Sequence, residues 1–405
     1  MSVDVFSPGR LGPLTLRNRT IKAATFEARS PGGLVSPDLI DYHVAVAEGG
    51  VGMTTVAYLA VSPEGRTDNA VIYLREEVLP GLTRLTDAVH ATGALVSGQL
   101  GHAGPVGNGR SNGAHAIAAS RMPSPLSMQF IRSATERDLT RVTKDFVAAA
   151  RLGVRGGLDC LELHFGHNYL ISSFLSPALN RRTDRWGGSL ENRARLARQV
   201  ARAVRDEVGD EVAVIAKLGM KDGAPGGFNL PESIEVARYL EADGNLDALQ
   251  LTAGSSLLNP MYLFRGEAPV EEFRQVMPPL VRFGMKYVGA KFMKTYPYEE
   301  AYLLPLARQF REALEMPLIL LGGISTRDTM DLAMEEGFAF VAMARALLQD
   351  PELLLRMQAG EARESGCIHC NRCMPSIYSY TNCWLSEHPA TAPRDPVAAN
   401  ADARN

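Results

Sequence analysis

Short apolar runs alternate with longer amphipathic segments along most of the chain. The runs predicted to be strands are residues 20–24, 52–57, 94–100, 159–164, 212–218, 246–252, 317–321 and 338–342. Their nearly continuous apolar character is typical of parallel strands buried on both faces. Helices are predicted at residues 37–48, 76–91, 136–151, 189–208, 231–241, 298–314 and 326–336, with a last one from residue 350. Eight strand–helix units favour a closed (β/α)8 barrel of the α/β class over an open doubly wound sheet.

The segments outside this repeat predict how the barrel is completed. Residues 6–19 are expected to form a small hairpin that plugs the barrel bottom. Two connections, residues 101–135 and 254–297, are long enough to be lids or binding elements. We therefore predict a barrel domain over residues 1–355 and a C-terminal extension over residues 356–405, with a flexible tail after Pro389.

The most informative polar group follows the fourth predicted strand, in the sequence HFGHNY. Two imidazoles, His164 and His167, and the phenol of Tyr169 can together bind a carbonyl oxygen and deliver a proton. The alternatives are a structural histidine or a zinc pair. Zinc would need a third ligand and usually an HExxH helix, and neither is evident in the sequence.

Polar residues also follow four other strands, where barrel enzymes carry their chemistry. The amide of Gln99 can hydrogen-bond the edge of a heterocycle. Lys217 emerges from an apolar run, so it needs an anionic partner if it is buried. Gly322 and Gly323 alone can be a tight turn, but with Arg345 after the next strand they favour a monophosphate site. A G-x-G-x-x-G fingerprint for a Rossmann dinucleotide site is absent from the sequence.

Composition and charge narrow the class of partner. The net charge of -3 provides no basic footprint, so nucleic acid is not an expected partner. Neither a signal pattern nor an apolar run of roughly 20 residues is present. We therefore predict a cytoplasmic enzyme that acts on small molecules without membrane contact, and a homo-oligomer is compatible with this composition.

Four of the five cysteines lie in one segment near the C-terminus: Cys367, Cys370, Cys373 and Cys383. Without a secretion signal, such clustering indicates a metal or redox site rather than a disulfide framework. Cys160 lies alone in an apolar strand and is expected to be a small packing residue.

Read together, these motifs resemble the Old Yellow Enzyme family of FMN-dependent NAD(P)H oxidoreductases, over residues 6–354. The most specific block is HFGHNYLISSFLSPALNRRTDRWGGSLENR, and QLGHAG, LILLGGIS, FVAMARALLQDP and LRNRTIKAA support it. The resemblance implies that His164 and His167 bind the substrate oxygen and that Tyr169 donates the proton. The residues that it places around FMN are Ala24, Thr25, Tyr58, Gln99, His164, Lys217, Gly322, Gly323, Ala344 and Arg345.

This sequence departs from the family pattern at several of these positions. Members usually carry Ala-Pro-Met where Ala23, Ala24 and Thr25 stand here, and a small residue in place of Tyr58. Ala344 replaces a usual glycine.

The contacts with FMN that the resemblance implies are Gln99 with the isoalloxazine edge, Lys217 with the N1–C2=O locus, and Gly323 and Arg345 with the phosphate.

The long insertion that contains MYLFRGEAPVEEF and KFMKTYPYEEAYLLP resembles the branch that includes 2,4-dienoyl-CoA reductase and trimethylamine dehydrogenase. The segment CIHCNRCMPSIYSYTNC is similar to the [4Fe–4S] segment of that branch, with a shorter last spacing. Cys367, Cys370, Cys373 and Cys383 are therefore candidate cluster ligands, with zinc ligands or free thiols as the alternatives.

The resemblance implies an ene-reductase cycle. NAD(P)H reduces FMN, the flavin N5 passes a hydride to the β-carbon of an α,β-unsaturated carbonyl, and Tyr169 protonates the α-carbon. Two alternatives stay open. One is a flavin dehydrogenase that oxidises an amine or a saturated ring, with electrons leaving through an Fe–S cluster. The other is an FMN/Fe–S redox sensor or electron-transfer protein without catalysis.

Overall fold

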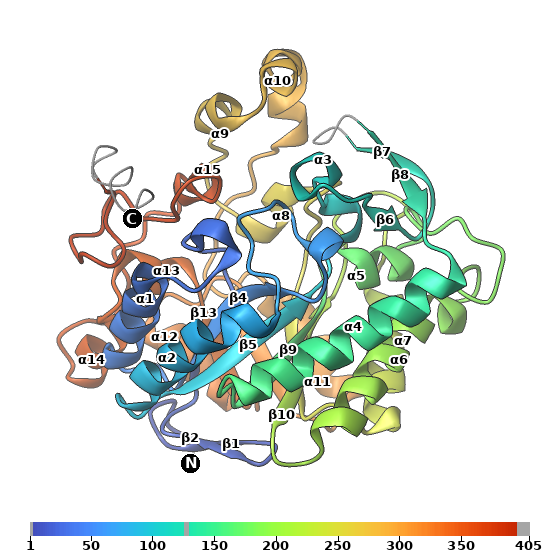
Figure 1. Ribbon diagram of the computed structural model, residues 1–405. Helices are drawn as coiled ribbons and strands as arrows, with labels where there is room; N and C mark the ends of the chain where they lie inside the picture. The colour runs from blue at the N-terminus through green and yellow to red at the C-terminus, as the bar shows by residue number, and fades with distance from the viewer. Residues whose placement is uncertain (1–2, 125–128, 395–405) are drawn as a thin grey trace.

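A computed structural model describes residues 3–124 and 129–394. Its centre is a closed barrel of eight parallel strands in the order β10-β11-β12-β13-β3-β4-β5-β9 (Figure 1). The strands are β3 (Thr20–Lys22), β4 (Met53–Ala60), β5 (Leu95–Gly101), β9 (Cys160–Phe165), β10 (Ala213–Gly219), β11 (Ala248–Thr252), β12 (Leu318–Leu321) and β13 (Phe340–Met343). Each predicted strand is found, and the (β/α)8 barrel is confirmed.

Helices cover the outer face of the barrel. They are α1 (Pro37–Glu48), α2 (Leu79–His90), α4 (Glu136–Arg155), α6 (Leu190–Val208), α7 (Leu230–Asp243), α11 (Leu304–Ala313) and α12 (Arg327–Glu335), and α13 (Arg345–Gln349) and α14 (Leu353–Gln358) follow β13. Single 3-10 turns are η1 (Pro31–Gly33), η2 (Pro63–Gly65), η3 (Glu76–Val78) and η4 (Gly104–Val106).

Several helix boundaries differ from the prediction by a few residues, and α7, α11 and the last helix illustrate this. α7 begins one residue early because Asn229 is its N-cap and accepts from the Glu232 amide at 3.1 Å. α11 begins six residues late because Ala301, with φ 49°, turns the chain before it. The helix predicted from residue 350 is α14, which begins three residues later at Leu353, and the short helix α13 before it was not predicted.

The barrel interior is closed at its lower end by the predicted hairpin, β1 (Gly9–Leu11) paired with β2 (Leu14–Leu16) (Figure 1). Leu11 and Leu16 are fully buried against inward side chains of the barrel strands, among them Ile215 and Phe340. This apolar plug leaves the polar residues of the strands concentrated towards the opposite, carboxyl end.

Both long connections lie at that carboxyl end (Figure 1). The first contains α3 (Gly109–Asn112) and a small sheet of β6 (Ile117–Ala118), β7 (Met122–Ser124) and β8 (Gln129–Ser133). The second contains α8 (Pro260–Phe264), α9 (Val270–Val276) and α10 (Pro279–Phe292), of which α9 and α10 project from the barrel. The chain after β9 contributes α5 (Leu170–Leu175).

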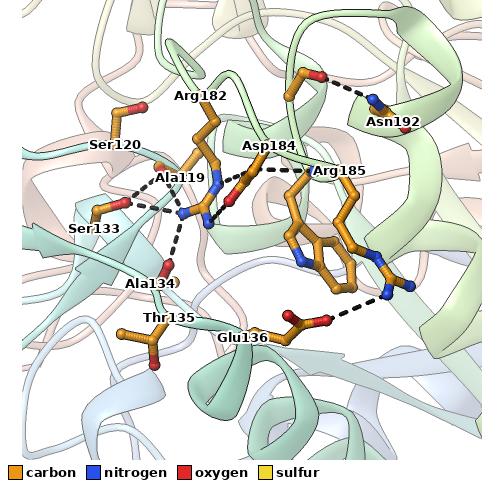
Figure 2. Close-up of polar contacts among 12 residues, drawn as sticks. Ala119, Ser120, Ser133, Ala134, Thr135, Glu136, Arg182, Asp184, Arg185 and Asn192 are labelled. Carbon is orange, nitrogen blue, oxygen red and sulfur yellow. Dashed lines mark hydrogen bonds and ion pairs between the residues drawn. The ribbon is translucent and has the colours of Figure 1, made fainter.

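The charged RRTDRWGG segment fastens the first connection to the loop after β9 (Figure 2). The guanidinium of Arg182 donates to the carbonyl oxygens of Ala134 at 2.6 Å and Ala119 at 3.2 Å. It also donates to the Ser133 hydroxyl at 2.9 Å and to Asp184 Oδ1 at 2.9 Å. This part of the most specific sequence block is therefore structural.

The C-terminal extension folds back over the carboxyl end of the barrel and contains α15 (Cys373–Ser376). Thr381 joins it to the chain after β3, through its hydroxyl to the Phe26 carbonyl at 2.6 Å and through its amide to the Glu27 carbonyl at 3.1 Å. The predicted tail is packed as far as residue 394, where Arg394 pairs with Asp38. Residues 395–405 lie outside the described part of the chain. Among the described helices, none has both the length and the apolar character needed to cross a membrane.

Candidate functional site

A cavity of about 580 Å³ opens at the carboxyl end of the barrel. Its wall contains all the residues predicted to bind cofactor or substrate: Ala24, Thr25, Tyr58, Gln99, His164, His167, Tyr169, Lys217, Gly322, Gly323, Ala344 and Arg345. They come from strand ends that are far apart in sequence. The closed barrel brings them together because all its parallel strands end at one rim.

His164, His167 and Tyr169 form one aromatic group on this wall. The ring centroids of His164 and His167 are 5.1 Å apart, and those of His164 and Tyr169 are 4.5 Å apart. His164 lies at the end of strand β9, whereas His167 lies in the following loop with φ 60° and its Nε2 is 3.0 Å from the Thr252 hydroxyl. The two imidazoles and the phenol thus converge as the sequence predicts.

Burial fixes the protonation states of this group. It lowers the pKa of His164 well below its usual value, and it lowers the pKa of His167 to about 3; the charge of Lys217 acts in the same direction on both. Burial also raises the pKa of the Tyr169 phenol above its usual value. At neutral pH the site therefore holds two neutral imidazoles and a protonated phenol, all able to donate a hydrogen bond.

Lys217 has the anionic partner that its position requires. Its Nζ is 2.9 Å from Glu162 Oε1, and the Gln99 amide donates to the same oxygen at 2.5 Å. All three side chains are buried. Burial lowers the pKa of Lys217, and the Glu162 carboxylate opposes that shift. Glu162 therefore orients both residues predicted to contact the polar edge of the flavin.

Glu162 was not predicted, although the sequence carries a signal for it. It is an isolated acid in the apolar run CLELHF, two residues before His164 and so on the same face of the strand. A second buried ion pair, Lys22 with Glu27, lies nearby. The charge of Lys22 lowers the pKa of Lys217, and the charge of Glu27 raises it. The structure therefore has two buried ion pairs near the cavity, one of which includes the lining residue Lys217.

The other end of the cavity combines glycines with a cation. Gly322 and Gly323 adopt φ 102° and 77°, which only glycine takes without strain. Arg345 follows β13, and one of its amino groups donates to the Arg265 carbonyl at 3.0 Å and to the Asn371 side chain. Asn371 was not predicted, because it reaches the site from the distant cysteine segment.

The departures from the family pattern have visible consequences. Tyr58 turns its hydroxyl away to the Gly65 carbonyl, at 2.9 Å, and packs its ring at 5.6 Å from that of Tyr169. It therefore narrows the cavity beside the proton-donor candidate. The outer wall is apolar, with Phe264, Phe273 and Met277 from the insertion around α8 and α9. Sequence reasoning anticipated a binding role for this insertion but not these residues.

The four clustered cysteines are free thiols, and Cys373 lies on the cavity wall. Burial raises the pKa values of Cys367, Cys373 and Cys383, that of Cys373 to about 12, and neighbouring thiols add to each shift. The segment thus gathers its thiols in one place. Among the described residues, however, no group of three or more His, Cys, Asp or Glu side chains is arranged to hold a metal ion.

The residues of the cavity fit a flavin mononucleotide. Gln99 and Lys217 present polar groups on the cavity wall, and Arg345 with the Gly322–Gly323 turn offers a cation beside backbone that also lines the cavity. Within the described chain, Nδ1 of the buried His164 has no hydrogen-bond partner, so a ligand atom can take that place. A planar heterocycle with a single phosphate group fits the polar groups of Gln99 and Lys217 at one end of the cavity and the cation of Arg345 at the other.

Comparison with known proteins agrees with this geometry. Residues 4–252 match the NADH:flavin oxidoreductase / NADH oxidase family. The 4,4'-dithiodibutanoate disulfide reductase of Rhodococcus erythropolis is 56% identical over 380 residues, which is 94% of each chain. The NADH oxidase of Thermoanaerobacter brockii is 31% identical over 381 residues, 91% of this chain and 53% of that relative.

Among solved structures, a complex of 2-naphthoyl-CoA reductase with 2-naphthoyl-CoA has a TM-score of 0.79 and 26% identity. The match covers 98% of this chain and 57% of that one. The chain thus spans nearly all of the disulfide reductase but about half of the other two proteins. The predicted family is confirmed. The chain is an FMN-dependent oxidoreductase that belongs to the NADH:flavin oxidoreductase / NADH oxidase family.

Proposed function

We propose that the protein uses NAD(P)H to reduce a small electrophilic organic substrate, the first candidate being the activated C=C bond of an α,β-unsaturated carbonyl. The observation that carries this proposal is the convergence of His164, His167 and Tyr169 on the wall of the flavin cavity. FMN, when bound, supplies the two-electron redox chemistry. The chain supplies binding, orientation and the proton.

In this proposal, different walls of the cavity hold different parts of FMN. Gln99 and Lys217, both oriented by Glu162, hold the polar edge of the ring system. Arg345 holds the phosphate. The residues that pack around the rest of the cofactor are Ala24, Thr25, Tyr58, Gly322, Gly323 and Ala344.

The substrate is proposed to bind with its carbonyl oxygen between the two imidazoles. Neutral His164 and His167 each donate one hydrogen bond to that oxygen, which gains negative charge as the double bond is reduced. Loss of one such donor typically costs about 3–4 kcal/mol of transition-state stabilisation. Tyr169, protonated and beside His164, delivers the proton to the substrate carbon.

A second candidate is the reduction of an organic disulfide. The relative that favours it is 56% identical along nearly the whole chain and is named for the reduction of 4,4'-dithiodibutanoate. One disulfide, one NAD(P)H and one proton would give two thiols and NAD(P)+. The same side chains serve this reaction, because Tyr169 can protonate a departing thiolate and the imidazoles can donate to it.

No step of either reaction is routed through the cysteine segment. Among the described residues, its thiols are not arranged as a group that could hold a metal ion. Iron and sulfide analysis of the purified protein tests the cluster prediction directly. About four irons for each chain would assign the four cysteines as cluster ligands.

The proposed function is tested by steady-state NAD(P)H oxidation under nitrogen. Purified protein with its FMN content measured is given 2-cyclohexenone or 4,4'-dithiodibutanoate as the acceptor. From 2-cyclohexenone we expect one cyclohexanone for each NAD(P)H consumed. From 4,4'-dithiodibutanoate we expect two molecules of 4-mercaptobutanoate for each NAD(P)H consumed. Neither product forming with either acceptor, from protein that contains FMN, would overturn both candidates.

A further inference from the structure

The loop that carries the catalytic candidates has an unfavourable backbone shape. His167 and Asn168 are consecutive residues with φ of 60° and 58°, in the left-handed region that ordinary side chains rarely adopt. Such a conformation persists only where the surroundings over-determine it. The question is which contacts hold this loop, because its shape sets the direction of both His167 and Tyr169.

Asn168 supplies the contacts. Its side chain is fully buried, and its amide nitrogen donates to Asp222 Oδ1 at 3.0 Å. Its amide oxygen accepts from the Ser255 hydroxyl. Ser255 in turn accepts from the backbone amide of Leu258 at 2.8 Å. The side-chain amide of Asn168 thereby joins the loop after β9 to the loops after β10 and β11.

Asp222 is the acceptor that completes this network. It is 5% exposed, and its second oxygen accepts from the Ser176 hydroxyl at 2.6 Å and from the Phe228 amide at 2.8 Å. Among the described residues no lysine, arginine or histidine forms an ion pair with it. A buried carboxylate satisfied only by neutral donors is costly to maintain, which indicates that its acceptor role has a purpose.

We propose that the Asn168–Asp222 pair is a positioning device for the reaction, in which the hydrogen bond between the two side chains fixes His167 and Tyr169 over the flavin cavity. The inference rests on the proposed function for its activity readout. Neither residue of the pair lines the cavity, so both act through the loop. Two further contacts depend on the same loop: the Ser256 amide donates to the His167 carbonyl at 3.2 Å, and the Tyr169 amide donates to the Gly166 carbonyl at 3.2 Å.

The network can be broken and rebuilt by exchanging the two side chains. Asn168→Asp places two carboxylates at the 3.0 Å contact, so they repel each other. Asp222→Asn removes the carboxylate that accepts from three donors. In the double variant, the amide nitrogen at position 222 donates to the carboxylate at position 168, while the amide oxygen at position 222 accepts from Ser176 and Phe228. The carboxylate at position 168 also accepts from Ser255, so every bond is restored and the bond between the pair has its direction reversed.

The test is a double-mutant cycle on the FMN-loaded protein, with Asn168→Asp, Asp222→Asn and the double exchange. We expect kcat/KM for the reduced acceptor to fall about 100-fold in Asn168→Asp and about 10-fold in Asp222→Asn. The double exchange should return to within about fivefold of the parent. Reduction by dithionite, which needs no substrate site, should stay unchanged in all three.

A second readout does not use catalysis. The unfolding temperature of the apoprotein should fall in Asn168→Asp and recover most of that loss in the double exchange. Ser176→Ala, which removes one donor to Asp222 without adding charge, is the milder variant if Asn168→Asp does not fold. It should lower kcat/KM about fivefold with unchanged FMN content.

Two results would overturn the inference: single variants as active as the parent, or a double exchange no better than its weaker single variant. A parent protein that reduces neither acceptor defeats the proposed function instead. In that case, recovery of the unfolding temperature still decides whether the pair interacts as described.

Discussion

Glu162 lies between two side chains that the proposed function needs, Lys217 and Gln99, and accepts a hydrogen bond from each on one oxygen. Desolvation lowers the pKa of the buried Lys217 amine, and the charge of Glu162 acts against that shift. A cation placed there without a counter-charge would be unstable at this depth. The ion pair therefore orients the amine that is proposed to lie at the polar edge of the flavin.

Glu162→Gln should make folding stability depend on pH above neutrality. With its partner removed, the pKa of Lys217 falls further below the unfolded value of about 10.4. The unfolded state then binds more protons, so stability is lost as pH falls through that window. We expect the free energy of unfolding to drop by about 3 kcal/mol at pH 7, measured in urea. Glu207→Gln, which breaks a surface pair with Arg151, is the control and should change the free energy of unfolding far less.

Tyr169→Phe isolates the proton donor from its packing role. The ring can keep its contacts with His164 and Tyr58, whereas the hydroxyl is lost. We expect reduction of the organic acceptor to slow about 10²–10⁴-fold, with FMN content unchanged. Because burial raises the pKa of this phenol, the parent should lose no activity through its ionisation between about pH 6 and 9. Equal rates in parent and variant would remove Tyr169 from the mechanism.

Sequence reasoning located the candidate site residues but not their partners. His164, Lys217 and Arg345 could be placed because each lies at or just after the end of an apolar strand, and barrel topology gathers strand ends at one rim. Asn371 and Asp222 reach the same region from loops without periodicity. Nothing local in the sequence encodes which loops meet, so these contacts require the folded chain.

At the scale of elements, the hairpin β1–β2 and the insertions divide the barrel into a stable end and a binding end. The hairpin fills the lower interior with apolar side chains, whereas α8, α9 and the C-terminal extension supply apolar walls to the cavity. The predicted plug and long loops were confirmed as elements. The helices inside the second insertion were not predicted, because proline and glycine interrupt its pattern.

Leu16→Ala should destabilise the barrel without disturbing the site. Leu16 is fully buried at the end opposite the cavity, and large-to-small changes in such cores cost about 2–5 kcal/mol. We expect that loss in urea unfolding, with the flavin spectrum and turnover unchanged at about 25 °C. Leu355→Ala, at a position 45% exposed, is the matched control and should cost much less. A flavin site lost together with stability would show that the two ends are coupled.

For the whole molecule, burial of neutral histidines predicts sensitivity to acid. The pKa values of His43, His164 and His167 are all lowered by burial, that of His167 to about 3. In the unfolded chain they titrate near about 6.5, so stability is present above that pH and is lost as pH falls towards the lowered values. Between its lowered pKa and the unfolded value, each histidine should change the free energy of unfolding by about 1.4 kcal/mol for each pH unit. Urea unfolding from about pH 7 to pH 4.5 measures the slope, and His167→Asn should reduce it.

The central claim is that Gln99 and Lys217 would help to hold FMN in this cavity, and that the loaded protein passes electrons from NAD(P)H to an organic acceptor with a proton from Tyr169. One anaerobic single-turnover experiment tests it most directly. The flavin is bleached with one equivalent of NAD(P)H and mixed with 2-cyclohexenone or 4,4'-dithiodibutanoate in a stopped-flow instrument. The account predicts that flavin absorbance returns in full with one of these acceptors, and far more slowly in Tyr169→Phe. Flavin that stays bleached with both acceptors, or returns equally fast in the variant, would contradict it.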